Sequence, residues 1–307
     1  MKTADLTAEM ARSLSEVEYR WPTRIPAAFE QKMIAGDRTD PIARQVLPSI
    51  EELKDRDGYS DDPVGDRAAE NGEGLLVKYD GRALLLMSAL CAVHCRYCFR
   101  REYRRSTPPV NASSRKKALE RLGAMMDVKE VILSGGDPLM LPNGKIAEVL
   151  TAIDTMAHIE RIRIHTRMVT AVPERIDPPL LAALKTTRKP LIVVTHVNHA
   201  AELDEATAST LSKIRETGAL LLNQSVLLRG VNDSIEALVA LSEKLIGQGV
   251  VPYYLHQLDR VTGAAHFEVP IAEGRSLIDA LRKRCPGYMV PRYVIEVPGA
   301  ASKSAIL

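Results

Sequence analysis

The segment that decides the fold is ALLLMSALCAVHCRYCFRR, residues 83–101. An apolar run suited to a buried strand, Ala83–Met87, leads into a loop that carries Cys91, Cys95 and Cys98. Strands that are covered on both faces are short and mostly apolar in this way. The segment therefore predicts a buried parallel strand whose carboxyl end presents three thiols.

The same strand pattern recurs along the chain. Further strand candidates begin about thirty residues apart, at Glu130–Leu133, Arg161–His165, Leu191–Thr195, Ala219–Leu222 and Val250–Leu255, and a last one is Tyr293–Val297. Amphipathic helical stretches separate them, at Lys116–Met126, Ile146–Met156, Leu180–Thr187, Glu205–Thr217 and Ile235–Gln248. This alternation predicts parallel β/α units. An open doubly wound sheet is disfavoured because its G-x-G-x-x-G fingerprint is missing. The sequence thus predicts an α/β fold, a partial (β/α)6-type barrel.

The first 74 residues differ from the rest. They are polar, lack a strand rhythm, and include an Asp-rich stretch, residues 55–74, that is typical of a long loop. The scattered apolar residues of Pro48–Leu53 suit short helices. We therefore expect an N-terminal helical and loop extension, residues 1–74, followed by a barrel domain, residues 75–307, with a short C-terminal segment.

Composition argues against several classes of function. The 307 residues carry 41 Lys and Arg against 39 Asp and Glu, a formal net charge of +2, and only 4% are aromatic. A dedicated nucleic-acid binder would be more basic and richer in stacking side chains. The N-terminus has no apolar signal region, and the longest apolar run, Ala83–Val93, is too short to span a bilayer. We expect a cytoplasmic protein that binds neither membrane nor nucleic acid.

Polar side chains follow nearly every predicted strand. Residues 134–139 read SGGDPL, 165–167 HTR, 195–199 THVNH, 223–225 NQS and 256–259 HQLD. In a β/α barrel the carboxyl ends of all strands face one mouth, where active sites are built. We therefore expect cysteines, histidines, acids and arginines from separate segments to meet there.

The three clustered cysteines form a C-x3-C-x2-C motif. Three thiolates on one tight loop can hold three corners of a [4Fe-4S] cluster and leave the fourth iron open to a ligand. The alternatives are a zinc site, with His94 or Cys285 as fourth ligand, and reduced core cysteines. Zinc favours a second pair of ligands further along, which is missing, so the spacing favours the iron–sulfur cluster. Cys285 is otherwise expected to be a small buried hydrophobe.

The cysteine motif follows the first barrel strand, and SGGD follows the second. Together these two motifs resemble those of the radical S-adenosylmethionine (SAM) superfamily. In that superfamily the backbone of a glycine-rich motif similar to SGGD approaches SAM closely. Longer strings resemble the lysine 2,3-aminomutase family: LLVKYDGRALLL, CAVHCRYCFRR, LSGGDPLM, THVNHAAEL, LLNQSVLLRGVND, PYYLHQLD, GAAHF and EVPGAASK. The resemblance covers Leu75 to Lys303. CAVHCRYCFRR and PYYLHQLDRVTGAAHF look closest to the branch that makes β-lysine for elongation factor P.

The resemblance implies three cofactors and the residues that bind them. Cys91, Cys95 and Cys98 would hold the [4Fe-4S] cluster. Lys303 would bond covalently to pyridoxal 5′-phosphate (PLP), with Arg82 and Lys78 beside the same cofactor. SAM would lie against Ser134, Gly135, Gly136, Asp137, His196 and Gln224.

The resemblance also implies how a small amino acid substrate is held. Arg100 would pair with the substrate carboxylate through two parallel hydrogen bonds. Asp259 and Glu296 would flank the distal ammonium of a lysine, since two carboxylates around one ammonium are favourable in a desolvated pocket. Glu296 stands where many family members have Asp, and GAAS precedes Lys303 where the family often has glycines.

Two further features of the sequence either have no place in this expected site or differ from the family. Arg101, Arg104 and Arg105 are either a solvated basic run or a place for a phosphate or an acidic partner. Family members that form metal-linked tetramers use an additional cysteine where this chain has Ser234, so we expect their structural zinc to be missing.

The activity implied by the resemblance is that of an isomerase. It is a radical SAM, PLP-dependent 2,3-aminomutase that converts L-lysine to β-lysine, for the modification of elongation factor P. An external reductant such as flavodoxin or ferredoxin would supply electrons, and assembly as a homodimer is left open. Three alternatives stay open: an aminomutase for arginine or glutamate, a radical SAM enzyme without PLP, and a zinc-binding interaction protein built on a barrel.

Overall fold

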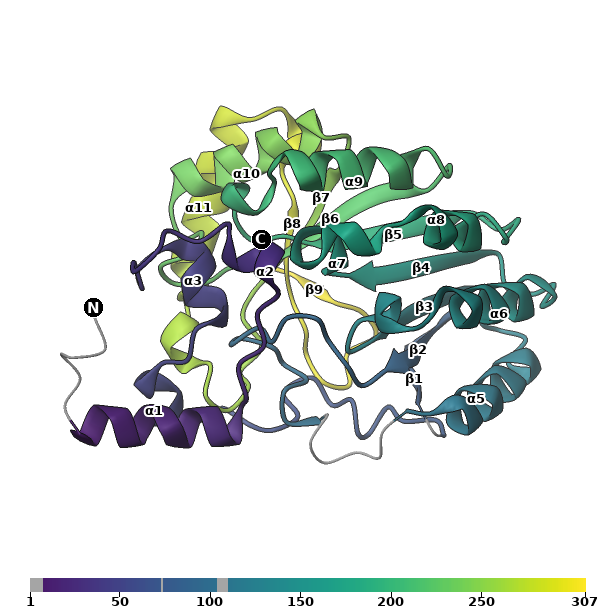
Figure 1. Ribbon diagram of the computed structural model, residues 1–307, viewed down its shortest axis with the longest axis horizontal. Coiled ribbons are helices and arrows are strands. Elements are labelled where there is room, and N and C mark those ends of the chain that lie inside the picture. The colour runs from purple at the N-terminus through teal and green to yellow at the C-terminus, as the bar shows by residue number, and fades with distance from the viewer. Residues whose placement is uncertain (1–7, 73, 104–109) are drawn as a thin grey trace.

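The computed structural model describes residues 8–72, 74–103 and 110–307. The strands of this part of the chain form one nine-stranded sheet (Figure 1). Its strands lie side by side in chain order: β1 (Leu75–Tyr79), β2 (Arg82–Ser88), β3 (Glu130–Gly135), β4 (Arg161–Thr166), β5 (Leu191–His196), β6 (Leu220–Val226), β7 (Val251–His256), β8 (Arg292–Ile295) and β9 (Ser304–Ala305). β2 to β8 are parallel, and the edge strands β1 and β9 are antiparallel to their neighbours. The predicted partial β/α barrel is confirmed, and every predicted strand is present.

Helices follow the parallel strands and cover the outer face of the sheet (Figure 1). The longer ones are α5 (Ala112–Ala124), α6 (Asn143–Asp154), α8 (Pro178–Leu184), α9 (Glu205–Arg215), α10 (Ile235–Gly247) and α11 (Ile271–Arg284). Shorter turns of helix lie between them: η3 (Pro138–Met140), α7 (Met168–Ala171), η4 (Pro173–Arg175), η5 (Ala200–Glu202), η6 (Ala265–Phe267) and η7 (Gly287–Met289). Their sequences explain their ends. Side-chain oxygens cap α5, α8, α9 and α10 at Asn111, Asp177, Asp204 and Ser234.

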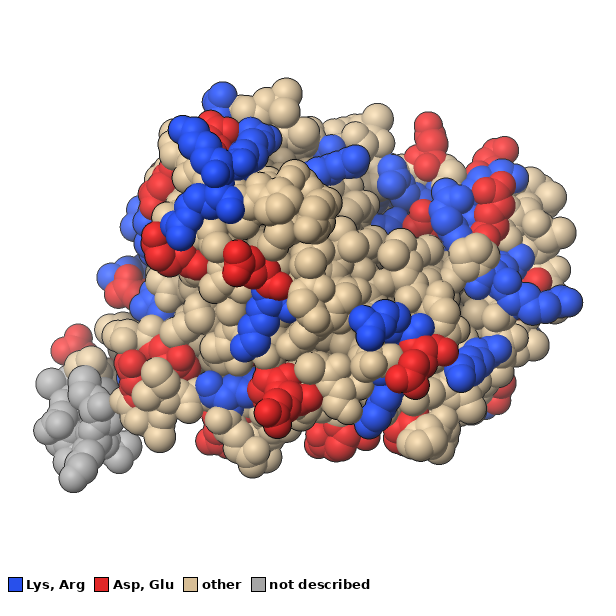
Figure 2. Space-filling model, turned by 90° about the horizontal axis from the view of Figure 1, so that it is seen from above, with Lys and Arg blue, Asp and Glu red and all other residues tan. Residues whose placement is uncertain are grey.

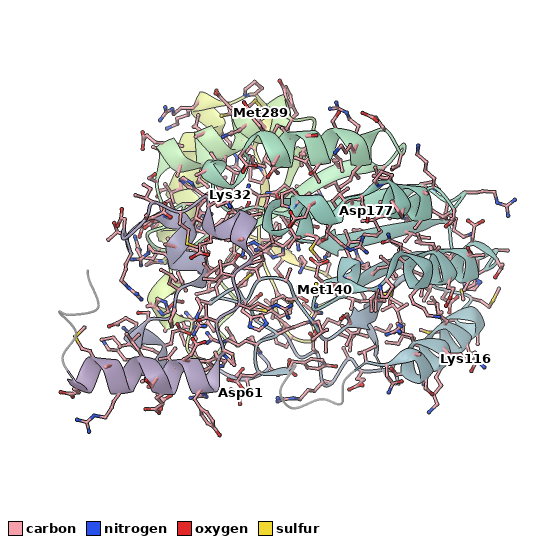
Figure 3. The ribbon with its side chains drawn as sticks, in the orientation of Figure 1. Lys32, Asp61, Lys116, Met140, Asp177 and Met289 are labelled. Carbon is pink, nitrogen blue, oxygen red and sulfur yellow. The ribbon has the colours of Figure 1, made fainter. Side chains whose placement is uncertain are left out.

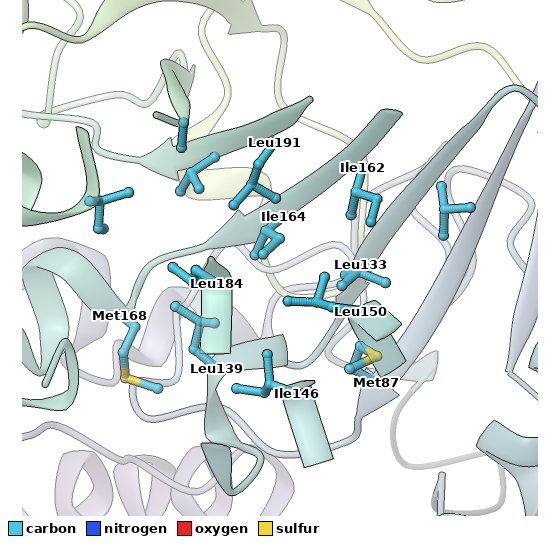
Figure 4. Packing of buried hydrophobic residues seen from close by; sticks show 14 of the residues in the cluster. Met87, Leu133, Leu139, Ile146, Leu150, Ile162, Ile164, Met168, Leu184 and Leu191 are labelled. Carbon is cyan, nitrogen blue, oxygen red and sulfur yellow. The ribbon is translucent and has the colours of Figure 1, made fainter. Parts of the chain in front are cut away.

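The strands have one apolar and one polar face. In β4, Ile162 and Ile164 are buried against the outer helices, where they pack with residues such as Leu133 and Leu150 (Figure 4). The alternate residues Arg163 and His165 line a cavity on the inner side. The expectation of apolar residues on both faces therefore holds only for the helix-covered face, because the inner face of this barrel lines a polar site.

Besides the short turns of helix, the sequence did not predict the edge strands β1 and β9 or the long helix α11. β9 has two residues, too few for a periodic signal. The α11 sequence is interrupted by Gly274, which normally weakens a helix. A Cβ at Gly274 would lie 2.1 Å from the Tyr293 hydroxyl oxygen, so glycine here permits the close packing of α11 on β8.

The N-terminal region wraps around the cysteine loop. It contains α1 (Ala8–Arg20), α2 (Ala27–Glu30), α3 (Pro41–Val46) and η2 (Ile50–Leu53), and the Asp-rich stretch after it is mainly turns, as predicted. Glu52 on η2 is fully buried and pairs with both Arg96 and Arg101 of the loop, at 2.7 and 2.6 Å. Lys32, which is labelled in Figure 3, belongs to the same region. It pairs with Asp204 and donates to the Glu202 carbonyl, and so joins this region to the barrel. Breaking such buried ion pairs is costly, so these contacts fix the loop.

The surface is of mixed charge. Lys and Arg alternate with Asp and Glu over the face seen in Figure 2. Arg101 is buried against Glu52 and so does not belong to a solvated basic run, whereas Arg104 and Arg105 lie outside the described residues. Within the described ranges, no helix combines the length and the apolar character that crossing a bilayer requires.

Candidate active site

A cavity of about 490 Å³ runs through the inside of the barrel. The cysteine loop lines it on one side and Lys303, from the chain's C-terminal segment, on another. Every residue predicted from the sequence to bind the cluster, SAM, PLP or substrate lies in its wall. Its size is within the range typical of ligand sites, so the structure offers one site for all the predicted chemistry.

The three cysteines of the motif are half-buried and all face this cavity. The two other ligands considered for zinc lie elsewhere: His94 bonds to the Pro22 carbonyl through Nδ1, at 2.7 Å, and Cys285 is buried in a separate apolar cluster. No three His, Cys, Asp or Glu side chains of the described residues converge on a point suited to a single metal ion. In a [4Fe-4S] cluster each thiolate binds a separate iron atom, and three thiols that face one cavity suit this arrangement.

The glycines of SGGD bring two backbones together. Gly135 has a φ of +123°, and a Cβ there would lie 2.4 Å from the Ser88 carbonyl oxygen. A Cβ on Gly136 would lie 2.1 Å from the Leu90 carbonyl oxygen. Both glycines are therefore required because β3 packs directly against the start of the cysteine loop, a reason that sequence analysis did not identify.

Asp137 in the same motif is buried and binds the protein itself. Its carboxylate accepts hydrogen bonds from the Thr166 hydroxyl at 2.9 Å and from the backbone N–H groups of Arg167 and Leu139. Burial raises the pKa of Asp137, and these hydrogen bonds oppose the rise. The side chain thus fastens the ends of β3 and β4 together at the barrel mouth.

Arg100 is held by an acid that sequence analysis missed. Its Nε donates to Asp66 Oδ2 at 2.6 Å, and Lys78 Nζ lies 2.6 Å from the other oxygen of Asp66. Burial alone would raise the pKa of Asp66, but Arg100 and Lys78 outweigh it and hold that pKa below its usual value. Asp66 comes from the N-terminal region, which therefore contributes directly to the cavity wall.

Lys303 is paired with Glu296. The Lys303 amine contacts Glu296 Oε2, while the Tyr79 hydroxyl donates to Glu296 Oε1 at 2.5 Å and Lys78 lies 3.6 Å away. Burial favours a raised pKa for Glu296, but Lys303 and the Tyr79 hydrogen bond lower it. Glu296 is therefore an ionised carboxylate that links β1, β8 and the C-terminal segment.

Asp259 shares this end of the cavity and has a different environment. Burial, with a smaller contribution from the negative charge of Glu296, raises the pKa of Asp259 to about 7, although Lys303 opposes the shift. A carboxylate in such a position is stabilised by an added cation. The pair Asp259 and Glu296 thus forms an acidic corner in which a ligand ammonium would be favourable.

Three histidines and an arginine complete the wall. Burial lowers the pKa of His196 to about 3 and places those of His165 and His256 well below the usual value, so all three rings are neutral. His196 Nε2 bonds to the Tyr97 hydroxyl at 2.7 Å. His165 Nε2 and Arg82 Nε are buried, and neither has a hydrogen-bond partner among the described residues. His165 and His256 belong to the HTR and HQLD segments, whose convergence was predicted, although sequence analysis did not single them out.

Comparison with known proteins identifies the family. The profile of the radical SAM superfamily matches residues 85–241. L-lysine 2,3-aminomutase of Escherichia coli (strain K12) is 42% identical over 283 residues, which are 92% of this chain and 82% of that protein. L-lysine 2,3-aminomutase of Buchnera aphidicola subsp. Baizongia pistaciae is 39% identical over 288 residues, 94% of this chain and 85% of that one. The chain belongs to the lysine 2,3-aminomutase family.

Solved structures support the fold of this aminomutase-family member independently. Streptococcus suis SuiB bound to S-adenosylmethionine matches with a TM-score of 0.54 at 16% identity, covering 73% of this chain and 52% of SuiB. At that identity the likeness concerns the fold alone. It shows that the curved sheet and its outer helices are shared with a protein whose structure was solved with S-adenosylmethionine bound.

Membership of this family makes the protein a radical SAM isomerase that uses a [4Fe-4S] cluster and SAM. The residues present fit these groups, because three half-buried thiols and the SGGD segment face one cavity. We assign the cluster to Cys91, Cys95 and Cys98 as a proposal, on their spacing and on this shared cavity.

Proposed function

We propose that this protein converts L-lysine to β-lysine and that PLP is its third cofactor, bound covalently to Lys303. The observation that carries the proposal is that Lys303, the acidic corner of Asp259 and Glu296, and the cysteine loop all line one cavity. A lone surface lysine is normally solvated, whereas Lys303 is half-buried and paired with Glu296.

The cavity fits PLP on its own chemistry. PLP brings a phosphate and an aldehyde, and the buried Arg82 Nε has no hydrogen-bond partner within the described residues. Lys78 and Lys303 line the same cavity as Arg82, so that an amine is present there for the aldehyde. An unsatisfied buried guanidinium nitrogen is costly unless a ligand oxygen meets it. We therefore propose that Arg82 and Lys78 bind an oxygen-bearing part of PLP.

The cofactors supply a carbon radical that removes a hydrogen atom from the substrate, and an aldehyde that carries the amino group between neighbouring carbons. The protein supplies position. Arg100, fixed by Asp66, holds the substrate carboxylate, and Asp259 with Glu296 holds the distal ammonium. A substrate gripped at both ends exposes its middle carbons in one orientation, which is a large part of such catalysis.

Glu296 has a second part in the proposed reaction. Its Oε2 contacts the Lys303 amine. That contact orients the amine within the cavity, where the amine can bond to the aldehyde once it has lost its proton, since the amine must be neutral to react. Tyr79 holds the opposite oxygen of Glu296 and so fixes its direction.

The test is one anaerobic assay. The protein is reconstituted with iron and sulfide and given SAM, PLP and dithionite with L-lysine, L-arginine or L-glutamate in separate reactions. We expect β-lysine from lysine alone, and β-arginine or β-glutamate instead would redirect the assignment. Borohydride reduction and peptide mass spectrometry should place the pyridoxyl group on Lys303. The same label on Lys78, or its persistence in Lys303→Ala, would refute the PLP assignment.

We further propose that the β-lysine produced serves the modification of elongation factor P and that flavodoxin or ferredoxin supplies the electron. Support comes from CAVHCRYCFRR and PYYLHQLDRVTGAAHF, which resemble that branch of the family. Intact-mass analysis of elongation factor P from cells with and without this gene checks it. An unchanged mass would refute the role while leaving the enzymatic proposal in place.

A further inference from the structure

A guanidinium lies in contact with one of the motif cysteines. Arg167 follows β4 in the HTR segment, and its Nη1 donates to Cys95 Sγ at 2.7 Å and to the Tyr97 hydroxyl at 2.9 Å. The residue is only 6% exposed. Since a guanidinium does not lose its proton in proteins, a permanent positive charge is buried beside this sulfur.

The surrounding side chains fix the direction of this guanidinium. Nη2 donates to Gln45 Oε1 at 2.6 Å and to Glu202 Oε2 at 3.0 Å, while the ring of Phe29 lies 4.9 Å from the guanidinium carbon. Gln45 and Phe29 belong to the N-terminal region, on α3 and α2. The N-terminal region therefore aims a cation at a cluster ligand.

Charge next to the sulfur affects how readily a cluster accepts an electron. Reduction adds one negative charge to the cluster, and hydrogen bonds to its sulfurs together with nearby charge set its reduction potential. We propose that Arg167 is a positioning residue that raises the reduction potential of the cluster through its hydrogen bond to the Cys95 sulfur, and that Glu202 limits this effect. The electron comes from a low-potential one-electron donor, which loses the electron that the cluster gains.

The Glu202 carboxylate gives the proposal a second, opposite consequence. It is fully buried and lies on the far side of the guanidinium from Cys95, bonded to Nη2. Removing its negative charge leaves the cation less compensated. The potential should then become more positive, whereas removing the cation should make it more negative. A merely structural defect predicts no such opposition of sign.

The experiment is a potentiometric titration of the cluster followed by electron paramagnetic resonance, without SAM or substrate. Arg167→Gln should lower the ratio of reduced to oxidised cluster at a fixed potential roughly tenfold, which is 59 mV for a one-electron couple. Glu202→Gln should shift it in the opposite direction. Arg167→Lys, which keeps the charge and loses the planar fork, should fall between wild type and Arg167→Gln.

Arg163→Gln is the matched control. Arg163 lies on β4, the strand that Arg167 follows, and also lines the cavity, but its guanidinium is paired with Glu130. Its removal should leave the potential within error of wild type. Iron and sulfide content is measured for each variant, and where Arg167→Gln does not retain the cluster, Glu202→Gln and Arg167→Lys decide the outcome.

Equal potentials in all loaded variants, or shifts of the same sign in the Arg167 and Glu202 variants, would overturn the proposal. The measurement needs only the cluster. It is therefore independent of which amino acid is the substrate and of whether PLP is bound.

Discussion

The binding of lysine should depend on pH through Asp259. The pKa of this carboxyl is about 7 because it is buried beside Glu296. Its ionised form attracts the distal ammonium of the substrate, and its protonated form does not. Lysine binding should therefore weaken as the pH falls through 7, although a free aspartic acid would stay ionised far below that value.

The size of the effect follows from the titration. With a pKa of about 7, roughly a tenth of the Asp259 side chains are ionised at pH 6 and roughly nine tenths at pH 8. The affinity for lysine should thus change about ninefold across this interval if Asp259 acts alone. Glu296, whose pKa is lowered by Lys303, should contribute no change in this range.

Norleucine gives the matched ligand control, because it has the shape of lysine without the ammonium. Dissociation constants are measured by calorimetry for both amino acids from pH 6 to pH 8. Their ratio cancels titrations that affect the common carboxylate and α-amino group. We expect the ratio to follow one proton with a midpoint near 7, and to become flat in Asp259→Asn. A ratio that is constant with pH in the wild-type protein would refute this role of Asp259.

The ligand-free protein offers a second measurement of the same pKa. A folded-state pKa above the ordinary value of 3.8 means that folding disfavours the ionised form. The cost is absent in strong acid, grows as the pH rises, and is complete above 7, where it is on the order of 4 kcal/mol. Asp259→Asn should therefore raise the free energy of unfolding at pH 8 and change it little near pH 4. Equal effects at both pH values would contradict the assigned pKa.

Two substitutions test how neighbouring segments support the site. Gly136→Ala should abolish iron loading, because the new Cβ would lie 2.1 Å from the Leu90 carbonyl oxygen. Gly144→Ala is the control and should load iron normally, because a Cβ there would have no atom within 4 Å. Normal iron content in both variants would count against the packing argument. Asp66→Asn should raise the KM for lysine about tenfold by releasing Arg100, for which we propose the binding of the substrate carboxylate. Asp61→Asn, at an exposed position of the same loop, should leave KM unchanged, and equal values for both variants would exclude that positioning role.

The apolar periodicity of the sequence was sufficient to predict the parallel strands of the barrel but not the strands at its edges. The parallel strands repeat an apolar pattern, and each predicted strand is present, whereas the pattern of α11 is interrupted by Gly274. The edge strand β9 has two residues and depends on pairing with β8, a contact that no periodic pattern encodes. The residues that were predicted for the site line one cavity. Most of them follow strands, and the carboxyl ends of parallel strands in a barrel converge on one mouth regardless of the segments that connect them.

What the sequence could not reveal is which of several equivalent residues becomes buried. The Asp-rich loop contains Asp55, Asp57, Asp61, Asp62 and Asp66, and nothing in their spacing distinguishes the last. Only the folded chain places Asp66 between Arg100 and Lys78, at 1% exposure. Which of these aspartates becomes buried is determined by tertiary structure, because it depends on the cations, here Arg100 and Lys78, that the folded barrel places opposite the loop.

The partial barrel also explains why both ends of the chain take part in the site. A sheet that does not close leaves two edges, here β1 and β9, and an open seam would admit water to the cavity. Glu296 closes this seam through Tyr79 on β1 and Lys303 before β9. A glutamate reaches both partners with its two oxygens, and its arm is one methylene longer than that of an aspartate. Because both Glu296 oxygens are engaged by Tyr79 and Lys303, the acid best placed to respond to a ligand ammonium alone is Asp259.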